Sequence, residues 1–179
     1  MNKIILGISG EMASGKTTIT KYLQKNYKAA TYRFSDILRD SLDRIHKDCS
    51  RENLQEMSTL LRIAFGEDAL AKSIAQDVKK DSSKLIVIDG VRRLGDIEHL
   101  RRVEGFKLVY VDTKLEKCHQ RIVIRNENSD DKGKTLEEFK KDRQREAEQQ
   151  IKELKNVADI NIYNDGSLEE LYKQLDKIV

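Results

Sequence analysis

Apolar and polar positions along the 179-residue chain form short apolar runs separated by longer amphipathic stretches. The apolar runs carry β-branched or aromatic residues, which is typical of strands buried on both faces of a parallel sheet. The amphipathic stretches predict helices, so the alternation indicates an α/β fold in which helices flank a five-stranded parallel sheet. The predicted strands are Ile4 to Ser9, Ala30 to Phe34, Leu85 to Asp89, Lys107 to Asp112 and Ala158 to Tyr163.

The longest stretch without a strand pattern, about residues 35–83, separates the second and third predicted strands. Ser35 or Asp36 is expected to open one helix, Ser50 to cap a second, and Gly66 to separate that helix from a third. Stacked helices of this size could form a cap that binds an acceptor substrate over the edge of the sheet. A simple helical crossover would give the same pattern, and both interpretations stay open.

A second irregular stretch, about residues 126–135, is polar. Thr135 and Glu138 have the spacing of a capping box, which predicts a helix from there to about Lys155. The stretch could be a mobile lid or an ordinary surface loop. We therefore expect a single domain over residues 1–179, with the cap, the lid and a core of 1–34, 84–125 and 136–179.

The composition is that of a domain that folds without covalent or metal cross-links. A chain of this length buries roughly 70% of its unfolded surface. Cys49 and Cys118 lie far apart and lack metal-ligand spacing, so the sequence predicts neither a disulfide framework nor a zinc site. We therefore expect a reducing cytoplasm. The run Ile4 to Ile8 is too short for a signal segment or a membrane span. The 34 basic and 31 acidic residues give a net charge of +3, which disfavours a dedicated nucleic-acid binder. A monomer and a dimer both fit.

The strongest chemical signal follows the first predicted strand. Gly10, Gly15, Lys16 and Thr17 complete the pattern G-x-x-x-x-G-K-[ST], a phosphate-binding loop. In such a loop backbone N–H groups turn onto phosphate oxygens, and the following helix adds a favourable dipole. Lys16 is expected to neutralise the phosphates of ATP or a similar nucleotide, and the Thr17 hydroxyl to ligate Mg²⁺. The other loop residues expected to bind the nucleotide are Ala13, Ser14 and Thr18.

Charged side chains also follow the third predicted strand. Asp89 ends that strand, at the sheet edge where α/β proteins bind ligands, and is expected to hold a magnesium-bound water. A helix-capping aspartate is the alternative interpretation. Arg92 and Arg93 come next, and guanidinium groups suit phosphate, although either arginine could simply be solvated.

Arg39 lies shortly after the second predicted strand. If that strand is parallel to the first, Arg39 could receive a second phosphate. The alternative is an exposed helical arginine that forms an i,i+4 ion pair with Asp43.

Four further arginines flank the predicted lid. Arg121 and Arg125 share one face of the preceding helix, and Arg143 and Arg145 follow the lid. They could converge on a transferring phosphoryl group, where stabilisation of charge is the main catalytic need. A plain charged surface would show the same residues.

These motifs occur in the order found in nucleoside monophosphate kinases of the adenylate kinase type, which the chain resembles over most of its length. The motifs are Gly10 to Thr17, Ser35 to Arg39, Asp89 to Arg93 and Arg121 to Arg125. The resemblance implies that Asp36 and Arg39 bind the acceptor phosphate, that Asp89 is a magnesium-linked acid, and that Arg93 or Arg92 binds the acceptor. It also implies that Arg121 and Arg125 are catalytic with Lys16, and that Arg143 reaches the acceptor.

The C-terminal segment from Ala158 to Leu168 resembles dephospho-CoA kinases instead, which implies that the turn at Gly166 approaches the donor adenine. The chain as a whole is similar to archaeal adenylate-kinase-related and dephospho-CoA-kinase-like proteins. It departs from the adenylate kinase pattern because Arg92 stands where a proline is usual, and because the lid is short and lacks zinc cysteines.

The sequence therefore predicts a P-loop kinase that uses ATP and Mg²⁺ and a small nucleotide-like acceptor. A nucleoside or deoxynucleoside monophosphate is the expected acceptor, and dephospho-CoA is the alternative. A slow NTPase acting as a switch or assembly factor is a rival of another class, in which Arg39 would be dispensable. An RNA-associated P-loop protein is disfavoured by the small net charge.

Overall fold

The computed structural model describes residues 3–125, 133, 135–144 and 146–179. One parallel sheet contains all five predicted strands in the order β2-β3-β1-β4-β5, which confirms the predicted fold class. The strands are β1 (Ile4–Ser9), β2 (Ala30–Arg33), β3 (Leu85–Asp89), β4 (Phe106–Asp112) and β5 (Ile160–Tyr163). β1 and β3 have the predicted bounds, β2 and β4 differ by one residue at one end, and β5 begins at Ile160 rather than at Ala158.

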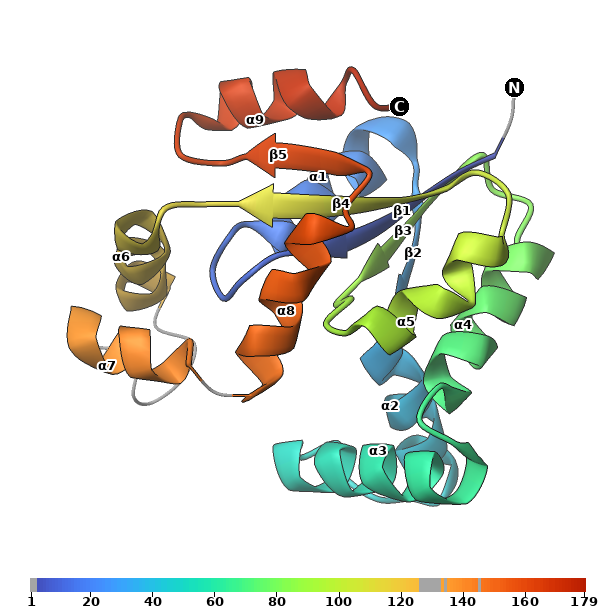
Figure 1. Ribbon diagram of the computed structural model, residues 1–179. Coiled ribbons are helices and arrows are strands. Elements are labelled where there is room, and N and C mark those ends of the chain that lie inside the picture. The colour runs from blue at the N-terminus through green and yellow to red at the C-terminus, as the bar shows by residue number, and fades with distance from the viewer. Residues whose placement is uncertain (1–2, 126–132, 134, 145) are drawn as a thin grey trace.

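Two layers of helices cover the sheet (Figure 1). Alternate residues of a strand point to opposite faces, so Ile5 and Leu6 enter different apolar clusters. On one face lie α1 (Lys16–Tyr27) and α9 (Leu168–Leu175). On the other face lie α4 (Ala69–Lys80), α5 (Leu94–Glu98), the 3₁₀ turn η1 (Leu100–Arg102) and α8 (Glu146–Asn156). None of the helices described is long and apolar enough to cross a bilayer.

The predicted helical insertion contains α2 (Phe34–Arg44), α3 (Arg51–Phe65) and α4. Five residues of α4 are buried, and three of them, Ile74, Ala75 and Val78, join the sheet cluster, so α4 is a covering crossover helix. In contrast, α3 projects away from the sheet (Figure 1) and has no buried residue among those whose side chains are described. Each interpretation of the insertion thus fits a different part of it.

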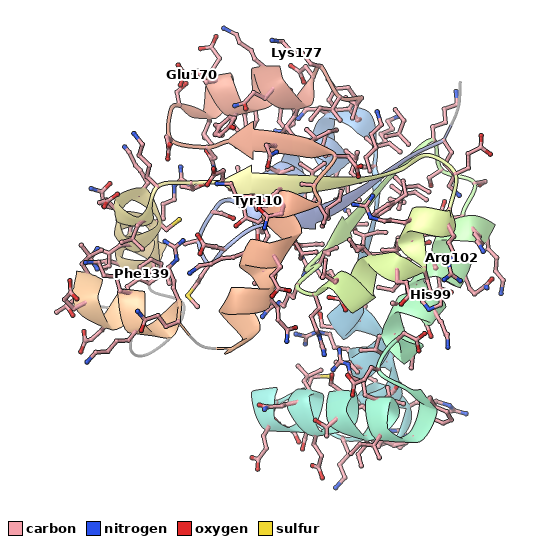
Figure 2. All side chains as sticks on the ribbon, viewed as in Figure 1. His99, Arg102, Tyr110, Phe139, Glu170 and Lys177 are labelled. Carbon is pink, nitrogen blue, oxygen red and sulfur yellow. The ribbon has the colours of Figure 1, made fainter. Side chains whose placement is uncertain are left out.

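The helix predicted from Thr135 to Lys155 is wrong, because two helices occupy that segment: α7 (Leu136–Asp142) and α8. The capping box itself is present, since Thr135 Oγ1 accepts from Glu138 N at 3.2 Å and Glu138 Oε2 accepts from Thr135 N at 2.8 Å. Phe139 is buried between α7 and α6 (Leu115–Arg125) (Figure 2), whereas Ile151 packs on the sheet. The first helix ends at Asp142, with Arg143 as its C-cap, and the two helices pack on different apolar clusters. Of the predicted lid, residues 126–132 and 134 lie outside the described residues.

Candidate functional site

The loop from Gly10 to Thr17 joins β1 to α1, as the motif predicts. Gly10 and Gly15 have φ angles of 147° and 104°, which favour glycine. A Cβ at Gly10 would lie 2.7 Å from Ser14 Oγ, and a Cβ at Gly15 would collide with Asn164 Nδ2. Both glycines are therefore required by backbone conformation and by space.

The carbonyl oxygen of Ser14 anchors this loop to neighbouring strand ends. It accepts from Asn164 Nδ2 at 2.8 Å, from Thr113 Oγ1 at 3.0 Å and, more weakly, from Arg121 Nη1 at 3.4 Å. Thr113 follows β4 and Asn164 follows β5, and both side chains are buried. Neither residue was predicted to have a role, although both, like Asp89, are polar residues at the carboxyl end of a buried strand.

Arg121 is held at the base of the loop rather than in solvent. Its Nη2 donates to the backbone oxygen of Asn164 at 2.8 Å and approaches the side-chain oxygen at 3.3 Å. The structure thus brings one predicted lid arginine to the nucleotide loop. The Arg125 side chain and the whole of Arg145 lie outside the described residues.

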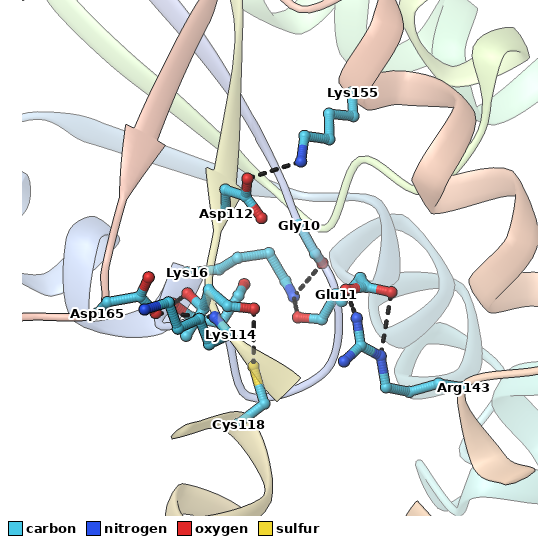
Figure 3. Close-up of polar contacts among 11 residues, drawn as sticks. Gly10, Glu11, Lys16, Asp112, Lys114, Cys118, Arg143, Lys155 and Asp165 are labelled. Carbon is cyan, nitrogen blue, oxygen red and sulfur yellow. Dashed lines mark hydrogen bonds and ion pairs between the residues drawn. The ribbon is translucent and has the colours of Figure 1, made fainter. Parts of the chain in front are cut away.

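The mouth of the loop has the groups that an anion needs. Lys16 Nζ reaches back to the carbonyl oxygens of Gly10 at 2.6 Å and Glu11 at 2.8 Å (Figure 3). Ser14 Oγ is buried without a hydrogen-bond partner among the described atoms, and Thr17 is exposed. The first N–H groups of α1 have no helical partner. These donors fit the phosphates of a nucleotide.

A buried ion pair joins the loop to the segment after α7. Arg143 Nε lies 3.0 Å from Glu11 Oε1, and a second contact joins its Nη2 to Oε2 (Figure 3). Both side chains are nearly buried, with exposed fractions of 12% for Arg143 and 11% for Glu11. The carboxylate would oppose a bound phosphate if Arg143 did not neutralise it. These contacts are with Glu11 of the phosphate-binding loop, and the role of Arg143 at the acceptor stays a prediction.

An apolar cluster supports the loop from below. Cys118 and Ile122 of α6 pack with Phe139, and Met12 and Ala13 of the loop rest against them. Burial raises the pKa of the Cys118 thiol to about 11, an effect that the charges of Arg121 and Lys16 partly offset. The thiol is therefore protonated at neutral pH and is a packing group rather than a nucleophile.

Asp89 lies at the same edge of the sheet as the loop. It pairs in register with Ile8 of β1, and its Oδ2 is 3.6 Å from Arg33 Nε. It does not cap the next helix, because the N-cap residue of α5 is Arg93 and the carboxylate that closes that turn is Asp96. A second acid, Asp112 at the end of β4, accepts from Lys155 Nζ at 2.6 Å (Figure 3) and was not singled out in the sequence.

The arginines predicted to bind the acceptor lie on α2 and in the turn between β3 and α5. Arg39 is exposed on α2, in the turn that begins near Asp36, and among the described residues no ion pair joins it to Asp43. Arg92 is exposed too. Arg93 Nη1 lies 3.6 Å from Glu67 Oε2, and the same oxygen is 3.9 Å from Nε of Arg62, which the sequence analysis did not single out.

The turn after β5 borders a cavity of about 420 Å³ between that strand and α9. Gly166 lines it together with Tyr163, Glu170 and Gln174. Gln174 also donates to Tyr163 O at 2.8 Å and accepts from Tyr163 N at 3.0 Å, so its amide pairs with the free edge of β5. The proximity of Gly166 to a donor adenine stays a prediction.

Two solved structures share this fold over nearly the whole chain. The crystal structure of TT1252 from Thermus thermophilus has a TM-score of 0.64 at 19% identity and covers 99% of this chain and 97% of that one. Shikimate kinase from Bacteroides thetaiotaomicron has a TM-score of 0.63 at 15% identity, with coverage of 98% and 96%. At these identities the likeness concerns the fold alone.

Sequence comparisons are more specific. A family model described as an AAA domain matches residues 6–160. A UPF0200 protein of Methanoregula boonei is 30% identical over 176 residues, which covers 98% of this chain and 95% of that protein. A UPF0200 protein of Staphylothermus marinus is 27% identical over 173 residues, with coverage of 97% and 89%. The chain therefore belongs to the AAA domain family and, with these relatives, to the UPF0200 family, and it has the α/β fold of P-loop kinases such as shikimate kinase, as predicted from its sequence.

Proposed function

We propose that this protein is a kinase that transfers the γ-phosphoryl group of ATP to a nucleotide-like acceptor, with a nucleoside or deoxynucleoside monophosphate preferred. One observation carries the proposal. The phosphate loop follows β1, the arginine-bearing turn follows the adjacent strand β3, and Ser9 Oγ donates to Val91 O at 2.9 Å between them. Donor and acceptor phosphates bound at these two turns would share one edge of the sheet.

Phosphoryl transfer asks the protein for positioning and charge stabilisation rather than for covalent chemistry. Lys16 would hold the β and γ phosphates of the donor. Arg121, fixed against Asn164 and the Ser14 carbonyl, would add positive charge from the α6 side. Arg39 and Arg92 or Arg93 would hold the acceptor phosphate, and Arg125 would close over the transferring group.

Magnesium fits the same set of residues. The exposed Thr17 hydroxyl and the Asp89 carboxylate at the adjacent strand end would hold the ion, Asp89 through a water molecule. When bound, the ion supplies charge neutralisation at the phosphate oxygens. Arg33, whose Nε lies 3.6 Å from Asp89 Oδ2, would orient this carboxylate.

The experiment that tests the proposal is a panel of acceptors in an assay of ADP formation with ATP and Mg²⁺. The panel contains ribonucleoside and deoxyribonucleoside monophosphates, dephospho-CoA, and shikimate, the last because shikimate kinase shares the fold. We expect at least one nucleoside monophosphate to stimulate ADP formation. Stimulation by dephospho-CoA alone would make that the acceptor, and no stimulation by any compound would exclude the kinase and favour a slow NTPase that acts as a switch.

A further inference from the structure

Two arginines from different parts of the chain meet at one exposed carboxylate. Arg62 belongs to α3, on the projecting side, and Arg93 immediately precedes α5, on the sheet side. Arg62 Nε and Arg93 Nη1 lie 3.9 Å and 3.6 Å from the same oxygen, Glu67 Oε2. The Glu67 side chain is 81% exposed, whereas that of Arg62 is only 15% exposed. The Arg93 side chain is 36% exposed, so the carboxylate that both arginines approach is the most exposed of the three groups.

The hydrogen-bonding capacity of Arg62 is not used up by the protein. Its Nη1 donates to Ser58 Oγ, but its Nε is buried without a hydrogen-bond partner among the described atoms. Burial lowers the pKa of Arg62, and the nearby charge of Arg93 lowers it further. An unpaired buried donor beside a like charge is unfavourable, and it is the arrangement that a bound anion would relieve.

A second carboxylate, that of Asp96, lies near both arginines, and its charge raises the pKa of Arg62. Asp96 is buried, and its Oδ2 accepts from the backbone N–H groups of Arg92 at 2.9 Å and Arg93 at 3.1 Å. That oxygen is committed to shaping the turn before α5. Two guanidinium groups therefore lie near one exposed carboxylate, that of Glu67, and one buried carboxylate, that of Asp96, which is already engaged by the backbone.

We propose that Arg62 and Arg93 together form an anion site, that its ligand is the phosphate monoester of the acceptor, and that this phosphate displaces the Glu67 carboxylate. Two planar guanidinium groups suit the oxygens of one phosphate. Because α3 contributes Arg62 and has no buried residue among those whose side chains are described, a phosphate held by both arginines would tie this helix to the sheet side of the molecule. The identification of the anion as the acceptor rests on the proposed function, whereas the anion site itself does not.

A cavity of about 590 Å³ adjoins Arg93 and provides room for the rest of the acceptor. Apart from that arginine, the charged side chains of its lining are carboxylates: Glu67, Asp68, Asp96, Glu98 and Glu153. Carboxylates accept hydrogen bonds from amino and hydroxyl groups and repel further phosphates. The acceptor class that fits has one phosphate at one end and hydrogen-bond donors over the remainder, as a nucleoside monophosphate has, rather than the pyrophosphate of dephospho-CoA.

The first test measures the affinity for inorganic phosphate by calorimetry while a non-hydrolysable ATP analogue and Mg²⁺ saturate the phosphate loop. Arg62→Gln should weaken phosphate binding about 10- to 100-fold, from the loss of one charge-assisted contact. Glu67→Gln should strengthen binding severalfold, because it removes the competing carboxylate. Arg44→Gln is the matched control, since Arg44 is an exposed arginine of α2 and should leave the affinity unchanged.

Opposite effects of the two variants cannot come from a general loss of structure, and Glu67→Gln keeps the test decisive should Arg62→Gln fail to fold. Unchanged phosphate affinity in both variants, or no saturable phosphate binding by the wild type, would overturn the anion site.

The second test is steady-state kinetics with the acceptor found in the panel. Arg62→Gln should raise the KM for the acceptor about 10- to 100-fold and leave the KM for ATP unchanged. Arg62→Lys should recover part of the loss. If the enzyme is active but its acceptor KM does not respond to Arg62→Gln, the acceptor assignment is wrong. If no acceptor is found but phosphate binding still depends on Arg62, the anion site stands and the proposed function fails.

Discussion

The two sides of the candidate site are built differently. The proposed donor side is the Gly10–Thr17 loop, and the proposed acceptor side consists of α2, α3 and the turn before α5. On the donor side, buried side chains after β4 and β5 hold the Ser14 carbonyl at 3.0 Å and 2.8 Å, and a nearly buried ion pair fixes Glu11. On the acceptor side, Arg39 and Arg92 are exposed, and Arg62 and Arg93 share one exposed carboxylate. The proposed donor loop is thus held by contacts within the protein, whereas the arginines of the proposed acceptor side are less firmly held.

The helices that carry the two sides explain this difference. The donor loop leads into α1, whose Ile19 and Leu23 are fully buried against the sheet. The acceptor side includes α3, whose Leu60, Ile63 and Phe65 are largely exposed. Elements with few buried contacts open and shift at low cost in free energy, which suits a part that closes on a substrate.

The largest expected effect comes from Lys16, at the centre of the rigid side. Lys16→Ala should lower turnover by about 10²- to 10³-fold, because a preorganised charge at the transferring phosphoryl group is lost. The circular dichroism spectrum and the urea midpoint should stay close to those of the wild type. Lys21→Ala, an exposed lysine of the same helix, is the control. Unchanged turnover in Lys16→Ala would remove the nucleotide loop from the mechanism.

Arg39→Ala tests the exposed side. If Arg39 holds the acceptor phosphate, this variant should weaken the use of the acceptor by about 10- to 150-fold, from the loss of a contact worth roughly 1.5 to 3 kcal/mol. The KM for ATP should not change. A switch-type NTPase would lose nothing in this variant, so equal rates with and without Arg39 would support that rival.

Asn164→Asp probes the anchor of the donor loop with almost no change of shape. The variant replaces the Nδ2 donor, 2.8 Å from the Ser14 carbonyl, by an oxygen that repels it, and keeps an acceptor for Arg121. We expect a loss of about 1 to 3 kcal/mol in the free energy of unfolding and a roughly tenfold higher KM for ATP. Urea unfolding and ATP titration measure the two effects. If the KM for the acceptor rises and the KM for ATP does not, Asn164 does not act on the proposed donor side, and the comparison between the two sides is wrong.

The smallest effect concerns the pH dependence of Asp96. Burial raises the pKa of its carboxyl above the unfolded value, and the N–H groups of Arg92 and Arg93 offset this only in part. The stability that it contributes is therefore complete below the unfolded pKa of about 4 and is lost as the pH rises through the folded pKa.

The Asp96→Asn variant has no carboxyl group at this position, so it should not show this loss of stability as the pH rises. At about pH 7 its free energy of unfolding should lie within about 1 kcal/mol of the wild-type value. Urea unfolding at about pH 4 and about pH 7 should show the wild type losing stability relative to the variant as the pH rises. A relative gain by the wild type would mean that the ionised carboxylate is the favoured form.

Much of the molecule follows from local sequence. The five strands are found within one or two residues because each is a compact apolar run, and the Gly10–Thr17 loop forms where the motif lies because its glycines demand that backbone. The caps at Ser50 and Thr135 could also be predicted from local sequence, because each is a hydrogen bond from a backbone N–H to a side chain three residues earlier. The prediction of one helix from Thr135 to Lys155 was wrong. The segment is polar throughout, and this pattern does not show that its two halves pack on different apolar clusters.

What the tertiary structure alone decided is which distant residues meet. The order β2-β3-β1-β4-β5 brings Thr113 and Asn164 to the Ser14 carbonyl, about 100 and 150 positions away along the chain. It also pairs Glu11 with Arg143 and sets Arg62 beside Arg93. Periodicity and motifs report only neighbours along the chain, so the sequence determined the strands and the phosphate loop. The contacts that hold the Gly10–Thr17 loop, and the approach of Arg62 to Arg93 at Glu67, arise only when the fold brings these distant segments together.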